Sequence, residues 1–480
     1  MLPSGSIGGC EDSQTMTLRN LLLAALLASG AAAAADDPFL TLSRELPSPA
    51  AEMRPAAVCS REFDRAAPLT LAAAVERALC ANPDTRSAWI TARLRAAERG
   101  QAEAAFLPGA SLDAGFGRRG ARALPDDDWA WNIGVRVQFL LYDFGGRRAD
   151  RDAAEALLAA AHASHDASVR RVYLETVAAW FAVLSAEGSV AAARQTEAAA
   201  LETVKAARAR VAAGSAIPAD RLQAETVHAQ RQIERIRAEG ERARLRGELA
   251  ALMGDAGHGD YRLAANETAF ADMPAVLERL DALIAAAKLR RPELRAAEAT
   301  LAAREANVAS VTAAGKPTLS AIFESRRQDT GPTAGTASSL NLAVSVPLFT
   351  GYRSTYQIRA AEAQRELAAV DRDRVANQVA LDVWQAYHKF KSEGEVAART
   401  DALVAGAEAA ESVALGRYKA GVGNILDVLT AQANLATARQ TRLQSQLGLR
   451  VARAELAQAM GDLTWDWIER PATPVGKGAQ

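Results

Sequence analysis

Residues 417–432 read RYKAGVGNILDVLTAQ, and residues 210–225 read RVAAGSAIPADRLQAE. The two stretches share six residue types in one frame, each pair 207 positions apart: Arg210 and Arg417, Ala213 and Ala420, Gly214 and Gly421, Asp220 and Asp427, Leu222 and Leu429, Ala224 and Ala431. Glycine lets a chain reverse between antiparallel helices, because it adopts left-handed backbone angles without steric cost. The chain therefore predicts the same helical turn twice.

The repeat extends well beyond the turn. The tripeptide Met-Gly-Asp at 253–255 returns at 460–462 in the same frame. Upstream, Pro108 returns as Pro317 at a spacing of 209, so a two-residue slip lies between Pro108 and the first turn. A period this long indicates a duplicated domain rather than a solenoid. We expect a first repeat at 68–255, a linker at 256–282, a second repeat at 283–462 and a C-terminal tail at 463–480.

The N-terminal segment has the pattern of an export signal. Arg19 precedes the apolar run LLLAALLASGAAAAA, and two aspartates follow it. This order is typical of a secretory signal peptide, so we expect residues 1–35 to be removed, with 1–15 as extra residues, and 36–67 to form an extension. The cleavage point has no cysteine for a lipid anchor. No other run of 18 apolar residues predicts a membrane-spanning helix, which excludes an inner-membrane pump.

Charge and cysteine content set further limits. The chain carries 56 basic and 57 acidic residues, and no block of like charge suggests a nucleic-acid partner. Cys59 and Cys80 remain after the leader is removed, and in an exported protein they predict a disulfide, with two unpaired thiols as the alternative. Two cysteines offer too few ligands for zinc.

Two segments alternate between apolar and polar residues over about ten positions, as a strand across an outer membrane does. The residues expected to face lipid are Trp129, Trp131, Ile133, Val135, Val137 and Phe139 in the first copy, and Leu340, Leu342, Val344, Val346 and Leu348 in the second. A half-buried strand of a soluble sheet is the simpler alternative. The tryptophan pair favours the membrane, because it lies at a strand end, where an aromatic girdle belongs.

Each of these segments has a weaker partner strand before it, SLDAGFG at 111–117 and TLSAIFES at 318–325. Polar, turn-rich segments at 118–128 and 326–337 separate the partners, so each pair predicts a hairpin. The run GFGRRG at 115–120 resembles a dinucleotide-binding motif. That motif needs a helix directly after it, and we interpret this one as a loop because a proline and three aspartates follow.

Very long helices are expected at about 147–212 and 353–419, and shorter ones at about 84–106 and 292–314. The long segments contain no proline, and about 66 residues give about 100 Å of helix. Apolar residues at steps of three and four, such as Val169, Val172 and Thr176, indicate a coiled-coil seam. Four strands cannot close a barrel, and an open edge is not stable in lipid. The chain must therefore assemble with copies of itself into a barrel that its helices continue as a duct.

The junctions LYDFGGRR (141–148) and PLFTGYRS (347–354) resemble the strand-to-helix junctions of TolC-type outer-membrane export channels. The two glycine–aspartate turns resemble that family's periplasmic tip, and the resemblance covers roughly residues 68–463. It implies a homotrimer with a twelve-stranded outer-membrane barrel and a twelve-helix periplasmic tunnel. It also implies a periplasmic adaptor and an inner-membrane ABC or RND transporter as partners. The early cysteine pair and the form CANPDTR resemble the type I secretion branch more than the multidrug efflux branch.

The same resemblance implies that the turns narrow the tunnel to an iris and dock the adaptor. The iris residues would be Asp220, Asp427, Tyr418 and Arg221, and the docking turns would use Arg210, Gly214, Leu222, Arg417, Gly421 and Leu429. Gly423 stands where the family has a closing arginine, and Thr430 where it has a second aspartate. The simpler interpretation of both aspartates is that they begin helices, and a helix-start role is compatible with an iris role.

Catalytic alternatives have little support, and we expect neither enzyme activity nor a cofactor. Five histidines are scattered, and no nucleophile motif accompanies them. His162 and His165 have the spacing of a metal pair on a helix, but an exposed helix face is the simpler interpretation, so no metal is expected. A non-conducting periplasmic spacer is disfavoured by the alternating strands. A periplasmic adaptor is disfavoured because the hairpin unit occurs twice.

Overall fold

The computed structural model describes residues 37–39, 41, 68–119, 128–255, 261–264, 279–329 and 334–463. The predicted signal peptide, most of the extension and linker, and the tail after Leu463 lie outside these residues. The elements run in the order α3 (Leu71–Ala81), α4 (Pro83–Ala104), β1 (Gly109–Arg119), β2 (Asp128–Tyr142), α5 (Gly146–Ala212), α6 (Pro218–Leu252), α7 (Leu280–Arg290), α8 (Pro292–Ala313), β3 (Thr318–Asp329), β4 (Ala334–Ser345), α9 (Arg353–Lys419) and α10 (Ile425–Ala459).

The duplication holds element by element. α7, α8 and the start of β3 follow α3, α4 and the start of β1 by 209 residues, whereas α9 and α10 follow α5 and α6 by 207. The slip therefore lies in the hairpins, between the start of β1 and the start of α5. The expected helices at 84–106 and 292–314 are α4 and α8, and the structure adds α3 and α7 before them. Asn82 separates α3 from α4, and its side chain accepts a hydrogen bond from the N–H of Asp84.

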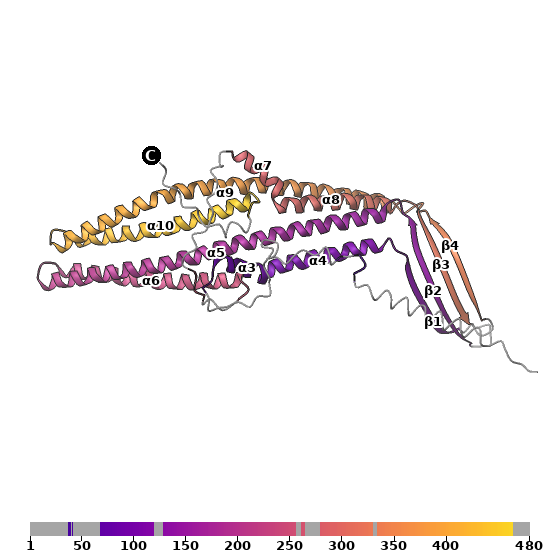
Figure 1. Ribbon diagram of the computed structural model, residues 1–480, viewed down its shortest axis with the longest axis horizontal. Coiled ribbons are helices and arrows are strands. Elements are labelled where there is room, and N and C mark those ends of the chain that lie inside the picture. Colours follow the sequence, from indigo (N-terminus) through magenta and orange to yellow (C-terminus); the bar gives the residue numbers. More distant parts are fainter. Residues whose placement is uncertain are drawn as a thin grey trace, which may run out of the picture.

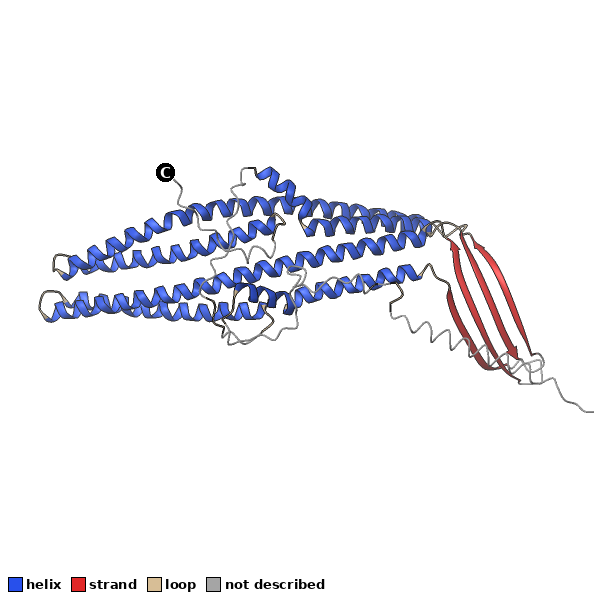
Figure 2. Ribbon diagram, viewed as in Figure 1, coloured by secondary structure: helices blue, strands red, loops and turns tan. Residues whose placement is uncertain are grey.

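The long helices form one elongated bundle with the sheet at one end (Figures 1 and 2). α5 and α9 have 67 residues each, or about 100 Å. Each packs against the helix that follows its turn, α5 against α6 and α9 against α10. Towards the sheet, neighbouring helices pack in the order α4, α5, α8, α9, and α10 also contacts α5, which joins the two repeats.

The main core lies midway along the bundle, where α3 crosses α5. Trp180, Tyr173 and Val177 of α5 are buried there with Leu79 of α3 and Met253 after α6. The repeated Met-Gly-Asp ends each copy against this region. Gly254 has φ +71°, and a Cβ on it would lie 2.7 Å from the Cβ of Ala81; Gly461 has φ +72° and the same relation to Arg290, at 2.9 Å. Both backbone angle and close packing therefore demand glycine at these two positions.

The four strands form one antiparallel sheet in the order β1-β2-β3-β4. The strands extend further than expected, since residues 326–329 and 334–337 are paired strand rather than loop. Val346 and Leu348 were wrongly predicted to lie in the last strand, because β4 ends at Ser345. Gly115 and Gly117 of the GFGRRG run lie in β1 rather than in a loop, and β2 follows on the chain.

One described helix, α5, has the length and apolar composition of a membrane span. The expectation that only the leader has such a composition is wrong for this helix. Alanine accounts for the difference, because it raises hydropathy while allowing close helix packing. α5 contacts α4, α6, α8 and α10 along its length, so its apolar stretch is explained by contacts within the bundle.

Candidate functional site

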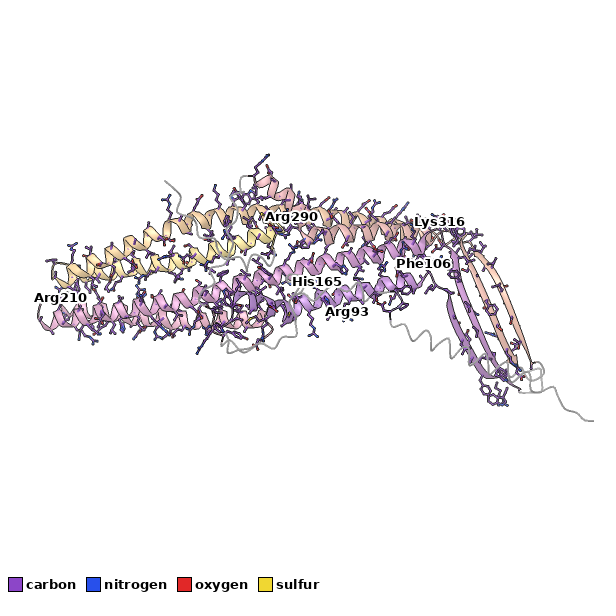
Figure 3. All side chains as sticks on the ribbon, viewed as in Figure 1. Arg93, Phe106, His165, Arg210, Arg290 and Lys316 are labelled. Carbon is purple, nitrogen blue, oxygen red and sulfur yellow. The ribbon has the colours of Figure 1, made fainter. Side chains whose placement is uncertain are left out.

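The two turns lie at the end of the bundle furthest from the sheet, where Figure 3 labels Arg210. Gly214 has φ +70° and Gly421 has φ +86°, and a Cβ on either would meet no atom within 4 Å. Backbone angle rather than space therefore selects glycine at both turns. The hydrogen bonds repeat in frame: the N–H of Ser215 donates to Arg210 O, and the N–H of Val422 donates to Arg417 O, at 2.9 and 3.1 Å. This pattern closes the ends of α5 and α9.

A cross-repeat contact joins the turns. The Arg210 guanidinium donates through Nη1 to Tyr418 O at 2.9 Å and through Nη2 to Ser215 O at 3.1 Å. The same guanidinium lies over the Tyr418 ring, with its Cζ 4.5 Å from the ring centroid. We call this contact the turn clamp. Its counterpart Arg417 is exposed and makes no such contact among the described residues.

Tyr418 anchors the clamp from below. It is 1% exposed and packs with Ile425 and Val428, and its hydroxyl has no hydrogen-bond partner among the described residues. Burial raises the pKa of Tyr418, and the nearby Asp220 carboxylate raises it further, while Arg210 opposes the shift. The phenol therefore stays protonated and neutral at physiological pH.

The predicted iris residues are only partly brought together. Asp220 lies in the first turn of α6, half-buried and close enough to Tyr418 to act on it electrostatically. Asp427 lies in the first turn of α10, exposed, and shares a shallow groove with Arg417 and Val413. Arg221 is exposed and takes no part in the clamp.

Gly423 explains the missing family arginine. A Cβ at this position would lie 2.8 Å from Tyr418 N and 3.0 Å from Arg417 C, both backbone atoms that cannot yield easily. A residue with a side chain therefore does not fit at 423 in this arrangement. The arginine that bridges the turns comes from the first turn instead. The sequence analysis placed Arg210 among docking residues and did not link it to Tyr418.

The hairpins are also tied above the turns. Gln432 of α10 donates to Thr203 Oγ1 of α5 at 3.1 Å, and both residues are buried. The same amide approaches Glu411 Oε1 of α9 at 3.4 Å. A buried amide that is bonded to both repeats fixes their relative position, because breaking it would leave polar groups unpaired. No sequence motif marked Gln432. At the docking turns, Leu222 is 55% exposed and Leu429 packs partly against Tyr418.

At the other end of the molecule, the strand register gathers the apolar residues on one face. Trp131, Val135 and Val137 pair with Phe116, Leu112 and Ala110 of β1, and Phe139 pairs with Ala321 of β3. β3 carries the same face to Leu340, Leu342 and Val344 of β4, which are 67–75% exposed. The opposite face is polar and includes an ion pair between Arg136 and Glu324 at 2.7 Å. One apolar and one polar face suit a wall between lipid and water.

Three further predictions have outcomes here. Cys80 is disulfide-bonded, and its predicted partner Cys59 lies outside the described residues, so that pairing stays a prediction. His165 is fully buried and His162 is half-buried, so the expected exposed face is wrong; packing in the bundle covers them. Burial lowers the pKa of His162, and the charge of His165 adds to the shift against Asp166. Among the described residues no group of three His, Cys, Asp or Glu side chains is placed to hold a metal.

Comparison with known proteins gives concordant results. The family model described as outer membrane efflux protein matches residues 74–255 and 283–462. Protein CyaE of Bordetella pertussis is 30% identical over 421 residues, which cover 84% of this chain and 86% of that protein. The solvent efflux pump outer membrane protein SrpC of Pseudomonas putida is 29% identical over 178 residues, 36% of this chain and 38% of that protein. The crystal structure of the Campylobacter jejuni CmeC outer membrane channel has the same fold, with TM-score 0.75, 16% identity, and coverage of 85% of this chain and 91% of that chain.

Proposed function

The chain belongs to the outer membrane efflux protein family, and from this premise we propose that three copies form the channel-tunnel of a tripartite export system. The protein is located in the outer membrane and projects into the periplasm. Cargo would pass from an inner-membrane transporter, through a periplasmic adaptor, to the outside. The family consists of channels rather than enzymes.

The observation that carries the proposal is the incomplete wall that one chain builds. β1 and β4 each have one unpaired edge, and a sheet edge cannot stay open in lipid. The helices beside those edges expose apolar side chains: Ile90 and Leu94 on α4 are 51% and 55% exposed, and Leu367 and Val370 on α9 are 66% and 65% exposed. Pairing the β4 edge of one copy with the β1 edge of the next would cover both sets.

Three copies suit this wall better than two. Four strands per chain give eight in a dimer and twelve in a trimer. The interior of a barrel of about eight strands is just wide enough for side chains to fill it, whereas larger barrels leave a channel. A trimer therefore leaves a lumen that the long helices can continue.

The turns would form the periplasmic entrance of this duct. In a trimer, Asp220 and Asp427 contribute up to six carboxylates, which we propose as a ring that attracts cations. The exposed docking turns around Gly214 and Gly421 would receive the adaptor.

Type I protein secretion is the cargo class that we favour. Its support is the form CANPDTR, in which Cys80 is disulfide-bonded and Asn82 separates α3 from α4. Multidrug efflux through an RND pump is the alternative, supported by the likeness to SrpC, whose name states solvent efflux. That likeness covers 36% of this chain, against 84% for CyaE.

Deletion of the gene in its own host tests the assignment. We expect a large secreted protein to disappear from the culture medium while the susceptibility to solvents and drugs stays unchanged, and plasmid-borne gene to restore secretion. Unchanged secretion with increased drug susceptibility would favour the efflux alternative. If neither property changed, the chain would not be an export channel in that host.

A further inference from the structure

The base of the sheet carries a cluster that export of cargo does not require. It consists of Tyr142 at the end of β2, Phe144 just after it and Lys316 just before β3, and we call it the junction cluster. The rings of Tyr142 and Phe144 meet edge to face, with centroids 4.8 Å apart. Lys316 Nζ lies 5.8 Å from the centroid of the Phe144 ring. Figure 3 labels Lys316 where the helical bundle meets the strands.

A β-bulge turns this cluster towards the lipid face. Along β2 the apolar face uses odd-numbered residues as far as Phe139, but the register shifts between Leu140 and Tyr142. After the shift Tyr142 pairs with Leu319, which pairs in turn with Val344 of the apolar face. Bulges re-aim side chains in this manner. The phenol ring, 54% exposed, therefore continues the lipid-facing surface at its periplasmic end.

The cluster stays exposed when copies of the chain assemble. β2 and β3 are the two central strands of the sheet, and a neighbouring copy pairs with β1 or β4. The cluster therefore lies in the middle of each copy's outer surface. By contrast, the similar ring pair of Phe349 and Tyr352 follows the edge strand β4, where a neighbour can cover it.

The height of the cluster matches the edge of the membrane. The upper aromatic group on the same face is Trp131, beside the stacked rings of Phe116 and Trp129. Eleven residues separate Trp131 from Tyr142, which is about 36 Å along a strand and about 28 Å across a membrane at a tilt of 40°. Outer-membrane barrels have an apolar band about 25 Å tall. Tyr142 thus lies at the lower rim of the band, and Lys316 lies beside the rings at that rim.

Backbone angles indicate that the aromatic ring at 144 is not incidental. Phe144 has φ +53° and Gly145 has φ +91°, and in the second copy Gly351 and Tyr352 have φ +62° and +64°. Each junction thus holds two left-handed residues, of which one is glycine and the other aromatic, in opposite order. Glycine would be free of strain at all four positions. Retention of an aromatic residue at a strained position indicates that its side chain is used.

The charge at the cluster is uncompensated. Lys316 is exposed and forms no ion pair among the described residues. The nearest acidic group of the junction, Asp143, is already occupied by Arg147, with Oδ2 3.2 Å from Nε. An exposed ammonium beside two rings at a membrane rim has the chemistry of a headgroup site, because lysine reaches towards phosphate while the rings lie in the interface.

We propose that the junction cluster binds the phosphate headgroup of a phospholipid in the periplasmic leaflet, with preference for an anionic lipid. The Lys316 ammonium contacts the phosphate oxygens, and the rings of Tyr142 and Phe144 lie against the glycerol and upper acyl chain. A trimer carries three such sites, evenly spaced around the barrel. The proposal depends on the outer-membrane location but not on the nature of the cargo.

Native mass spectrometry of the full-length protein in neutral detergent tests this site. Phosphatidylglycerol, phosphatidylcholine and inorganic phosphate are added separately, and bound lipids are counted for each variant. We expect phosphatidylglycerol to be retained over phosphatidylcholine, and Lys316→Gln to reduce its retention about fivefold, the effect of one cation near an anionic surface. Lys316→Arg should restore retention. Lys391→Gln is the matched control, because Lys391 is exposed on α9 and its replacement removes the same charge away from the sheet.

A second variant protects the test against misfolding. Phe144→Gly relieves the left-handed strain and should fold, yet it should also reduce phosphatidylglycerol retention because the ring is lost. The proposal is overturned if Lys316→Gln behaves as the Lys391→Gln control does, or if inorganic phosphate displaces the lipid. Normal export of cargo by a Lys316→Gln variant that binds lipid normally would refute this site alone and leave the channel function standing.

Discussion

Arg210 and Arg417 occupy the same place in the two repeats but have different surroundings. Arg210 bonds to Tyr418 O and lies over its ring, whereas Arg417 is exposed. This asymmetry makes Arg210 the candidate for holding the two turns together. Lysine cannot replace its planar two-pronged contact.

We expect Arg210→Ala to loosen the tip. Loss of one charged hydrogen bond and one cation–π contact costs about 2 kcal/mol, or a shift of more than tenfold towards the open arrangement. Single-channel recordings in planar bilayers should show a higher or more often open conductance. Arg417→Ala serves as the control and should behave as the unmodified protein does. Equal effects of the two substitutions would mean that the turn clamp does not restrain the tip.

The two aspartates make a separate prediction about ion selectivity. Carboxylates around a narrow pore attract cations, so the channel should prefer cations at neutral pH. Protonation neutralises carboxylates, so the preference should decline as the pH falls. Asp220→Asn combined with Asp427→Asn should reduce both the preference and its pH dependence, measured as the reversal potential in a salt gradient. Assembly should be unaffected, because both sites lie at the end of the bundle away from the sheet. An unchanged reversal potential would leave these residues as helix-start residues only.

Residue-scale prediction from sequence succeeded where the cause was local. The glycine turns and the aspartates in the first turns of α6 and α10 follow from backbone angle and helix polarity, which neighbouring residues reveal. The turn clamp was not predictable, because its partners are 208 residues apart. Burial of His165 was missed for the same reason, since helix neighbours distant in the sequence cover it.

Each long helix begins at the sheet with its own staple. The Asp143 carboxylate accepts hydrogen bonds from the backbone N–H groups of Arg147 and Gly145 at 2.7 and 3.2 Å, and the Arg147 side chain adds a third contact. In the second copy Thr350 Oγ1 bonds to Ser354 Oγ at 3.0 Å instead. Burial alone would raise the pKa of Asp143, but these hydrogen bonds and the Arg147 charge lower it.

We expect Asp143→Ala to destabilise the junction by about 1–2 kcal/mol, the usual effect of losing a helix-start side chain. Because the pKa is lowered in the folded state, the stabilisation is present at neutral pH and is lost as the pH falls below about 4. Denaturant unfolding in detergent, followed by circular dichroism at pH 7 and pH 3, measures it. Asp150→Ala is the control, since Asp150 is exposed on the same helix. A difference between the two variants that persisted at pH 3 would contradict the account.

Two glycines with nearly equal φ separate backbone strain from packing. Gly214→Ala should cost about 1 kcal/mol, since it adds only left-handed strain in open space. Gly254→Ala should cost about 2–4 kcal/mol, because its Cβ also overlaps Ala81. Thermal unfolding of the two variants, measured side by side, gives the comparison. Equal losses would show that α3 and the end of α6 can move apart without cost.

Element-scale prediction was accurate for α9, which spans the expected 353–419, because prolines and glycine turns bound the helices. It was less accurate for the strands. Residues 334–337 are small and polar, without the alternation that marks a strand, and only their pairing with β3 makes them β4. Val346 and Leu348 keep the alternation although the pairing has ended.

At the scale of the whole molecule, one chain is a third of a wall. Its apolar sheet face, its two open sheet edges and the exposed apolar residues on α4 and α9 are explained together by neighbours on both sides. The sequence predicted this need from strand number alone. Which helices would border the open edges was not predictable, because that depends on how α4, α5, α8 and α9 pack.

The mass of the assembly, extracted from outer membranes in mild detergent and measured by native mass spectrometry, tests the central claim most directly. The account predicts a single species of three mature chains, whose barrel has twelve strands. A stable monomer or dimer as the main species would contradict it, because neither would leave a closed wall around an open duct.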